Sequence, residues 1–473
     1  MARAYAGRRR LPGTLRVVVL LTLTAGLVMP VAGAQGMVTS GAPTPMFSDG
    51  DGIHVVAVTP IDSRQYNVRV LSEALGRAVD IRILLPSDYA QLGTARFPVL
   101  YLFHGTSGRA SDWVTMGDAE ATTAPLELIT VMPDAGFDGD GGSWFTNWVD
   151  TSTPKGPSRW ETFHVSQLVP WVDANLRTVA ERRGRAIAGL SQGGFGSMTY
   201  AARHPDTFVA AASFSGAPEI DRDPDVIIGA TAVIEATALG LNQTEPEAMF
   251  GSRVTNEVNW QGHDPSTLMT NLRGMGLFLW TATGMQGPYD PSPNPGASGI
   301  EYMTHVSTQH FHDHLVEEGI PSYYNDYVYG THTWPYWARD LREFVSPMMA
   351  TFASPPAPST IDYRSVDAQW AQWDWAVSLT RPAVQEFSHL YDAGPGGFTL
   401  EGSGGATVTT PAVYQPGSVA SVTVVAPSRT TSTPMNVDAN GRLTISISLS
   451  SPLVGVTAPT GTARVTIQAP PAT

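Results

Sequence analysis

The fold is decided by residues 186–196, AIAGLSQGGFG, where a short apolar run leads into the pattern GLSQG. This is the G-x-S-x-G pattern of a nucleophile elbow, a sharp turn from a strand into a helix that exposes a serine hydroxyl. Glycines flank the serine because such a turn leaves no room for Cβ atoms beside it. The apolar residues before the pattern and the small residues after it favour an elbow over a glycine-rich turn with an incidental serine. Ser191 is therefore the predicted nucleophile.

Other continuous apolar runs predict a sheet around this elbow. The runs at 99–103, 128–132 and 276–282 indicate strands that are buried on both faces, as in a parallel sheet. Residues 66–70 and 79–85 are predicted to pair as two strands separated by Gly76. Predicted helices alternate with the later strands, at 162–176, 194–203 and 339–349. The predicted fold class is therefore α/β, an α/β-hydrolase fold with a mostly parallel sheet and helices on both faces.

The N-terminus predicts export. Arginines precede the apolar run 17–28, and Ala32-Gly33-Ala34 fits a cleavage site, so residues 1–34 are predicted to be a signal peptide. An uncleaved membrane anchor is the alternative, and Arg8-Arg9-Arg10 leaves export by the twin-arginine route open beside the general route. The expected location is secreted, extracellular or cell-wall associated.

Composition divides the rest of the chain. Residues 35–60 are predicted to be a loose lead-in, 61–352 the α/β-hydrolase catalytic domain and 353–360 a Pro-rich linker. Residues 361–473 alternate apolar and polar positions and are expected to form a small, all-β, sandwich-like accessory domain. Tryptophans in that domain suggest contact with cell-wall glycan, although burial in its core is the favoured interpretation; they are Trp370, Trp373 and Trp375.

Charge and cysteine content exclude several functions. The chain has no cysteine, which excludes disulfides, zinc–thiolate sites and cysteine nucleophiles. Its formal net charge is −14, and −19 without the five arginines of residues 1–34. A chain this acidic is a poor partner for nucleic acid or anionic lipid surfaces. No motif calls for a metal or an organic cofactor, and no stable membrane span is expected in the mature chain.

A base and two oxyanion donors are expected to accompany Ser191. In α/β-hydrolases the histidine comes last in the chain, and His332 lies between the predicted strand 323–329 and the last helix. The backbone N–H of Gln192, next to the nucleophile, is one expected oxyanion donor. The second is the N–H of Thr106, in the loop after the run 99–103.

Other histidines offer a competing interpretation. His310 and His314 are four residues apart, a spacing that suits two metal ligands on one helix, and His312 lies between them. An exposed polar helix face is the favoured interpretation, because no third ligand is evident nearby in the sequence. His204, in a turn after a predicted helix, is expected to be structural.

Three further motifs join the elbow in one pattern. They are FTNW at 145–148, WETF at 160–163 with Pro170-Trp171, and GTHTWPYW at 330–337. Together, over about residues 66–349, they resemble the esterase family that includes the antigen 85 mycolyltransferases. The resemblance implies a catalytic glutamate ten residues before Phe311 of the segment Gln309-His310-Phe311, which is Glu301. The residues alone leave Asp290 and Asp326 open as the acid.

The resemblance implies a secreted serine acyl-transfer enzyme that works through an acyl-Ser191 intermediate on sugar or lipid esters of the cell envelope. A simple carboxylesterase, which gives the acyl group to water, is the alternative, and a non-catalytic adhesin is a third hypothesis. At the two positions where mycolyltransferases carry an Asp and an Arg that contact sugar, this chain has His104 and Ser107. Together with Trp148 and Trp334, these two are the predicted substrate contacts.

Overall fold

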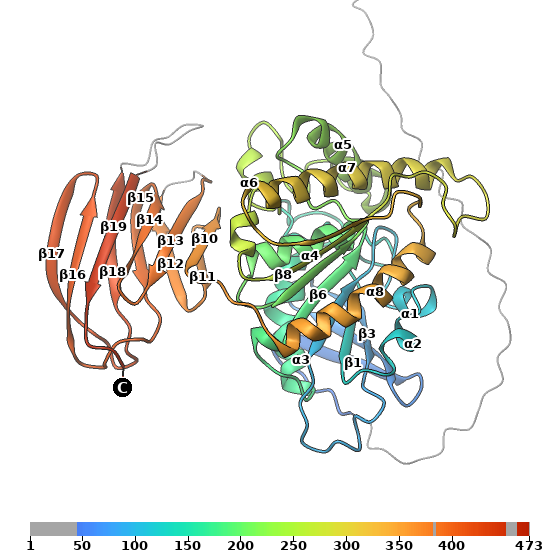
Figure 1. The fold of residues 1–473 in the computed structure, drawn as a ribbon, viewed down its shortest axis with the longest axis horizontal. Coiled ribbons are helices and arrows are strands. Elements are labelled where there is room, and N and C mark those ends of the chain that lie inside the picture. The colour runs from blue at the N-terminus through green and yellow to red at the C-terminus, as the bar shows by residue number, and fades with distance from the viewer. Residues whose placement is uncertain (1–44, 382–384, 451–460, 473) are drawn as a thin grey trace, which may run out of the picture. The chain divides into compact units, whose positions relative to one another are not determined.

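The computed structural model describes residues 45–381, 385–450 and 461–472. The predicted signal peptide, with its alternatives, lies outside them. The predicted fold class is confirmed: a mixed, mostly parallel sheet covered by helices is followed by two antiparallel sheets (Figure 1). The exact domain bounds stay a prediction.

The first sheet has nine described strands in the order β1-β2-β3-β5-β4-β6-β7-β8-β9. Neighbours from β5 across to β9 are parallel, and β1, β2 and β3 form an antiparallel edge. The strands are β1 Ile53–Pro60, β2 Gln65–Ser72, β3 Arg77–Leu84, β4 Val99–Phe103, β5 Ile129–Pro133, β6 Arg185–Leu190, β7 Ala210–Phe214, β8 Gly276–Thr281 and β9 Tyr323–Asp326.

Two strands of this sheet, β1 and β7, differ from what the sequence predicted. The predicted loose lead-in over residues 35–60 is wrong for its last part, because β1 pairs along its length with β2. Strand β7 was not expected, since its sequence AAASF is dominated by alanine, which has a low strand propensity. It is a strand because it is buried between β6 and β8, where packing overrides propensity.

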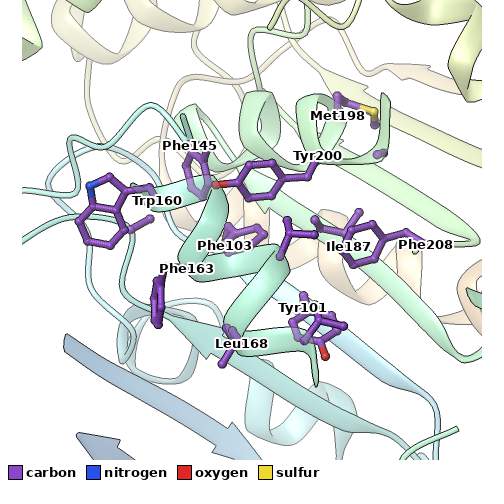
Figure 2. Close-up of a cluster of buried hydrophobic side chains, with 14 of the residues drawn as sticks. Tyr101, Phe103, Phe145, Trp160, Phe163, Leu168, Ile187, Met198, Tyr200 and Phe208 are labelled. Atoms are coloured by element: carbon purple, nitrogen blue, oxygen red, sulfur yellow. The ribbon is translucent and has the colours of Figure 1, made fainter. Parts of the chain in front are cut away.

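Helices cover both faces of this sheet. They are α1 Asp112–Thr115, α2 Ala119–Thr123, η1 Thr162–Leu168, α3 Val169–Asn175, η2 Arg182–Gly184, α4 Gln192–Arg203, α5 Pro224–Thr237, η3 Ala238–Asn242, α6 Glu257–Gln261, η4 Met269–Leu272, α7 Pro295–Glu317 and α8 Trp334–Ala353. Successive strand side chains alternate between faces. Tyr101 and Phe103 of β4 pack with the α3–α4 side, whereas Leu100 and Leu102 pack with α8. Figure 2 shows the first of these two clusters, with Phe103, Phe145 and Tyr200 close together.

Within the described residues, one helical stretch, Pro224–Asn242, is long and apolar enough to cross a membrane by length and composition alone. It comprises α5 and η3, and it is 22% buried over its most apolar window. One such helix is weak evidence for a span, because helices of water-soluble domains pass the same test. Here α5 runs beside α7 (Figure 1).

The C-terminal strands form two antiparallel sheets, in the orders β10-β13-β14-β19-β16-β17 and β11-β12-β15-β18. Trp370 and Trp375 are 8% and 2% exposed and belong to the core of these sheets, and Trp373 is partly buried. The strands are β10 Ile361–Ser365, β11 Gln369–Gln372, β12 Trp375–Thr380, β13 Ser388–Gly394, β14 Gly397–Gly402, β15 Gly404–Thr409, β16 Val419–Ala426, β17 Arg429–Asn436, β18 Thr444–Ser450 and β19 Gly461–Gln468.

Candidate active site

Ser191 lies in a strained turn between β6 and α4. Its φ and ψ are 53° and −125°, a combination that L residues rarely adopt. A Cβ at Gly189 would collide with the backbone of Gly193, and one at Gly193 would collide with the carbonyl oxygen of His104. The two glycines of the GLSQG pattern are therefore required by the backbone packing around Ser191, as the sequence predicted for an elbow.

His332 and Glu301 form a buried pair. His332 Nδ1 lies 2.7 Å from Glu301 Oε2, and the Glu301 side chain is fully buried. An ionised carboxylate only accepts hydrogen bonds, so Nδ1 carries a hydrogen, and in the neutral ring Nε2 then has a free lone pair. Nε2 is enclosed and has no hydrogen-bond partner among the described residues. This is the tautomer that a general base needs.

The other oxygen of Glu301 is held by two neutral donors. Ser215 Oγ donates to Glu301 Oε1 at 2.7 Å, and the backbone N–H of Ala282 donates to the same atom at 2.9 Å. Ser215 follows β7 and Ala282 follows β8, so the ends of two neighbouring strands fix the carboxylate. Ser215 is not among the predicted site residues, because β7 itself was not predicted.

The two aspartates that the residues left open make other contacts. Asp290 accepts hydrogen bonds from Thr331 Oγ1, from Tyr336 Oη at 2.8 Å and from the N–H of Gly287. Asp326 accepts from the N–H of Val328 at 2.9 Å. Asp290 therefore orders the loop that precedes His332, while Glu301 contacts the imidazole itself.

Thr106 and Gln192, the two predicted oxyanion donors, are joined by a side-chain hydrogen bond. Gln192 Nε2 donates to Thr106 Oγ1 at 3.0 Å, and Gln192 Oε1 accepts from the N–H of Trp144 at 3.0 Å. Gln192 begins α4, where a helix leaves its first N–H groups without intrahelical partners. In the part of the chain that the structure describes, neither the Thr106 nor the Gln192 backbone N–H donates to an acceptor, so both are available.

Two of the predicted substrate contacts are enclosed by the protein. His104 is 2% exposed; its Nε2 accepts from the N–H of Ala135, and its Nδ1 lies 2.8 Å from the carbonyl oxygen of Gly105. Trp148 is 4% exposed, and its indole N–H donates to the carbonyl oxygen of Ser143. These buried side chains leave no surface for a substrate in this structure, which argues against direct contact by either.

The other two predicted contacts are accessible. Ser107 is exposed in the loop after β4, and its N–H donates to Asp140. Trp334 is partly exposed at the start of α8 and meets the rings of Trp113 and Trp337 edge-on at 5.3 and 5.4 Å. Trp337 in turn meets the His332 ring at 4.9 Å, so an aromatic group borders the imidazole.

A serine at the elbow of a mostly parallel sheet, with a histidine–glutamate pair supplied by later elements, defines the class of α/β-hydrolase-fold serine hydrolases. Residues 72–346 match the family model described as "Putative esterase", and the chain belongs to that family. It is an enzyme family whose relatives include esterases and acyltransferases.

The relatives match somewhat more than half of this chain. Esterase Rv1288 of Mycobacterium tuberculosis is 34% identical over 279 residues, 58% of this chain and 57% of that protein. The diacylglycerol acyltransferase/mycolyltransferase Ag85B of Mycobacterium leprae is 28% identical over 303 residues, 61% and 84% of the two chains. The crystal structure of Mycobacterium tuberculosis MPT51 is 25% identical, with 61% and 99% of the two chains covered and a TM-score of 0.49. This chain thus spans little more than half the length of the first relative.

Proposed function

We propose that this protein is an exported serine acyl-transfer enzyme, with Ser191 as nucleophile, His332 as base and Glu301 as the acid that orients it. The observation that carries the proposal is the Glu301–His332 pair at 2.7 Å, in the same domain as a serine on a glycine-flanked elbow. A serine hydroxyl is a weak nucleophile until a base takes its proton, and His332 Nε2 is free to do so.

The chemistry proceeds in two halves. Ser191 Oγ attacks the ester carbonyl carbon as its proton passes to His332 Nε2, and the tetrahedral intermediate then expels the alcohol, which takes that proton. In the second half, an acceptor hydroxyl attacks the acyl-Ser191 ester, gives its proton to His332 and leaves with the acyl group. The proton returns to Ser191 Oγ. Glu301 stays ionised throughout and stabilises the imidazolium.

The N–H groups of Thr106 and Gln192 are proposed to hold the oxyanion. Preorganised N–H donors of this kind are worth about 10²–10³ in kcat each. The side-chain bond from Gln192 Nε2 to Thr106 Oγ1 ties the two donor segments together. Ser107 and Trp334 are the proposed substrate contacts, because both remain accessible.

The proposed acyl acceptor is a hydroxyl of a sugar or lipid of the cell envelope, in line with the named activity of the Ag85B relative. Hydrolysis, with water as acceptor, is the second candidate. It is favoured by His104, which is buried and bonded within the protein at a position where the mycolyltransferase resemblance implies a sugar contact. Export is proposed from the N-terminal sequence alone.

Covalent labelling tests the first half of the reaction, the acylation of Ser191, which acyl transfer and hydrolysis have in common. A fluorophosphonate probe is expected to label the wild-type chain once, and Ser191→Ala is expected to abolish labelling, with Ser197→Ala as the control because Ser197 Oγ is bonded inside α4. Labelling that survives Ser191→Ala would refute the proposal.

Product analysis with a trehalose ester then separates the two acceptors: a transesterified product supports transfer, and free acid alone supports hydrolysis.

A further inference from the structure

A second histidine–carboxylate cluster lies between the start of α5 and the C-terminal half of α7. It contains Glu219 and Asp223, from the segment before α5, and His310 and His314, from α7. The ligand atoms of Glu219, Asp223 and His314 all lie within 4.8 Å of one another. These carboxylates are candidate further ligands, which the sequence around His310 and His314 did not reveal.

The inner distances fit a metal ion bound by nitrogen and oxygen. Asp223 Oδ2 lies 2.9 Å from His314 Nε2 and 2.9 Å from His310 Nδ1. Glu219 oxygens lie 3.5 and 3.6 Å from the same two nitrogens. Ligand atoms around a tetrahedral ion with bonds of about 2.0–2.1 Å are about 3.3 Å apart. Small side-chain shifts would therefore bring these atoms into a coordination shell.

The outer nitrogens of both histidines also face carboxylates. Glu317 Oε2 lies 3.3 Å from His314 Nδ1, and Asp225 Oδ2 lies 3.8 Å from His310 Nε2. A carboxylate on the far nitrogen of a metal-bound histidine fixes the ring and its tautomer, leaving the near nitrogen free for the metal. His314 shows this arrangement at hydrogen-bond distance, whereas Asp225 lies beyond that distance from His310.

Protein groups alone do not satisfy all the hydrogen-bonding atoms of the cluster. A neutral imidazole donates from one nitrogen only, yet each ring has carboxylates at both. His310 Nδ1 is enclosed and has no hydrogen-bond partner among the described residues, although Asp223 is near. Glu219 is fully buried, so water does not compensate the charge of its carboxylate. A bound cation would remove this excess of negative charge.

The geometry points to a divalent transition-metal site, of the kind that binds Zn²⁺, formed by Glu219, Asp223 and His314 with His310 as the fourth ligand. Two imidazoles disfavour Ca²⁺ and Mg²⁺, which take oxygen ligands. Ser266 Oγ donates to Glu219 Oε2 at 2.7 Å and the N–H of Asp223 lies 3.2 Å from Glu219 Oε1, so the buried carboxylate is already oriented. A metal here would join the start of α5 to α7.

Metal titration of the full chain, without a polyhistidine tag and after chelator treatment, tests the site. Co²⁺ is expected to bind one per chain with the visible absorption of a tetrahedral complex, and Zn²⁺ is expected to displace it. His314→Ala and Asp223→Asn should each weaken binding by about 100-fold or more, and Glu317→Gln by about tenfold, as for outer-shell partners. His312→Ala is the matched control, because His312 stacks on Tyr324 instead.

Circular dichroism and ester hydrolysis show whether each variant is folded. Glu317→Gln keeps the test valid if His314→Ala does not fold, because the Glu317 side chain is 71% exposed. Absence of saturable Co²⁺ and Zn²⁺ binding by the wild-type chain would overturn the proposal. So would unchanged affinity in folded His314→Ala and Asp223→Asn. A loss of Ser191 activity without a loss of metal binding would not contradict the metal site, because metal binding is measured directly.

Discussion

Helix α7 supplies side chains to two histidine–carboxylate clusters that differ in one respect. Around Glu301, one histidine meets one carboxylate, and the second carboxylate oxygen is taken up by the neutral donors Ser215 and Ala282. Around Glu219, two histidines meet several carboxylates, and His310 Nδ1 is left without a hydrogen bond in the described part of the chain. The same residue types thus form a self-contained orienting pair in one place and a cluster that needs a cation in the other.

This difference in hydrogen bonding separates a carboxylate that orients a base from one that binds a metal. A carboxylate that orients a base needs every lone pair satisfied without cancelling its charge, because that charge must stabilise the imidazolium. A metal ligand needs a lone pair directed at a shared point. His310 lies nine residues after Glu301 on α7, which is about 14 Å along the helix axis. The two clusters are therefore far enough apart to be tested separately.

The largest expected effect is that of Glu301→Gln. An amide in place of the carboxylate removes the charge and can favour the wrong imidazole tautomer, so kcat for ester cleavage should fall by about 10³–10⁴ with the fold intact. Steady-state kinetics with a chromogenic ester measures it. Co²⁺ affinity should be unchanged in the same variant. If Glu301→Gln also lost Co²⁺ binding, the two clusters would not be independent sites.

A buried histidine without any carboxylate sharpens the comparison. His164 Nε2 lies 2.9 Å from the carbonyl oxygen of Asp134 and its Nδ1 lies 3.0 Å from Tyr200 Oη, and burial lowers its pKa to about 3. The unfolded chain, with a histidine pKa near 6.5, binds the proton more readily. Stability contributed by neutral His164 is therefore complete above about pH 6.5 and is lost as the pH falls toward 3, by up to about 5 kcal/mol.

Urea unfolding at several pH values checks this, with His164→Gln as the non-titrating reference. The stability advantage of the wild type over the variant should shrink between pH 6.5 and 4. A difference that stays constant with pH would show that protonation of His164 does not oppose folding.

Glu219→Gln tests the other carboxylate. We expect Co²⁺ affinity to fall by about 100-fold or more, because a neutral amide is a poor ligand for this ion class, while kcat changes less than about threefold. Competition between Co²⁺ and a colorimetric chelator measures the affinity. A drop in kcat as large as that of Glu301→Gln would mean that Glu219 serves the reaction.

The smallest expected effect is that of Asp290→Asn, since Asp290 bonds to Thr331 and Tyr336 and not to His332. Loosening the loop before His332 should lower kcat/KM by about tenfold or less. The same kinetic assay provides the measurement. If Asp290→Asn abolished turnover and Glu301→Gln did not, Asp290 would be the catalytic acid in place of Glu301.

Much of the fold was predictable from local pattern. Continuous apolar runs predicted β4, β5, β6 and β8 to within two residues, because strands buried on both faces leave an unmistakable composition. β7 was missed because alanines carry little strand signal. β1 was missed although its sequence IHVVAVTP is rich in residues that favour strands. Ser191, His332 and the N–H groups of Gln192 and Thr106 were predicted as site residues from position in the chain, and their roles remain predictions.

By itself, the sequence determined the elbow, since two glycines around Ser191 are required by a local backbone turn. It also determined that His332 follows the last strand of the sheet. The tertiary structure decided which acid meets His332, because Glu301, Asp290 and Asp326 are equally eligible along the chain and only packing brings one to 2.7 Å. It also decided that Asp223 meets His314, 91 residues away, because α5 and α7 pack together. Contacts over such separations have no local signature, since they depend on how whole elements are placed against one sheet.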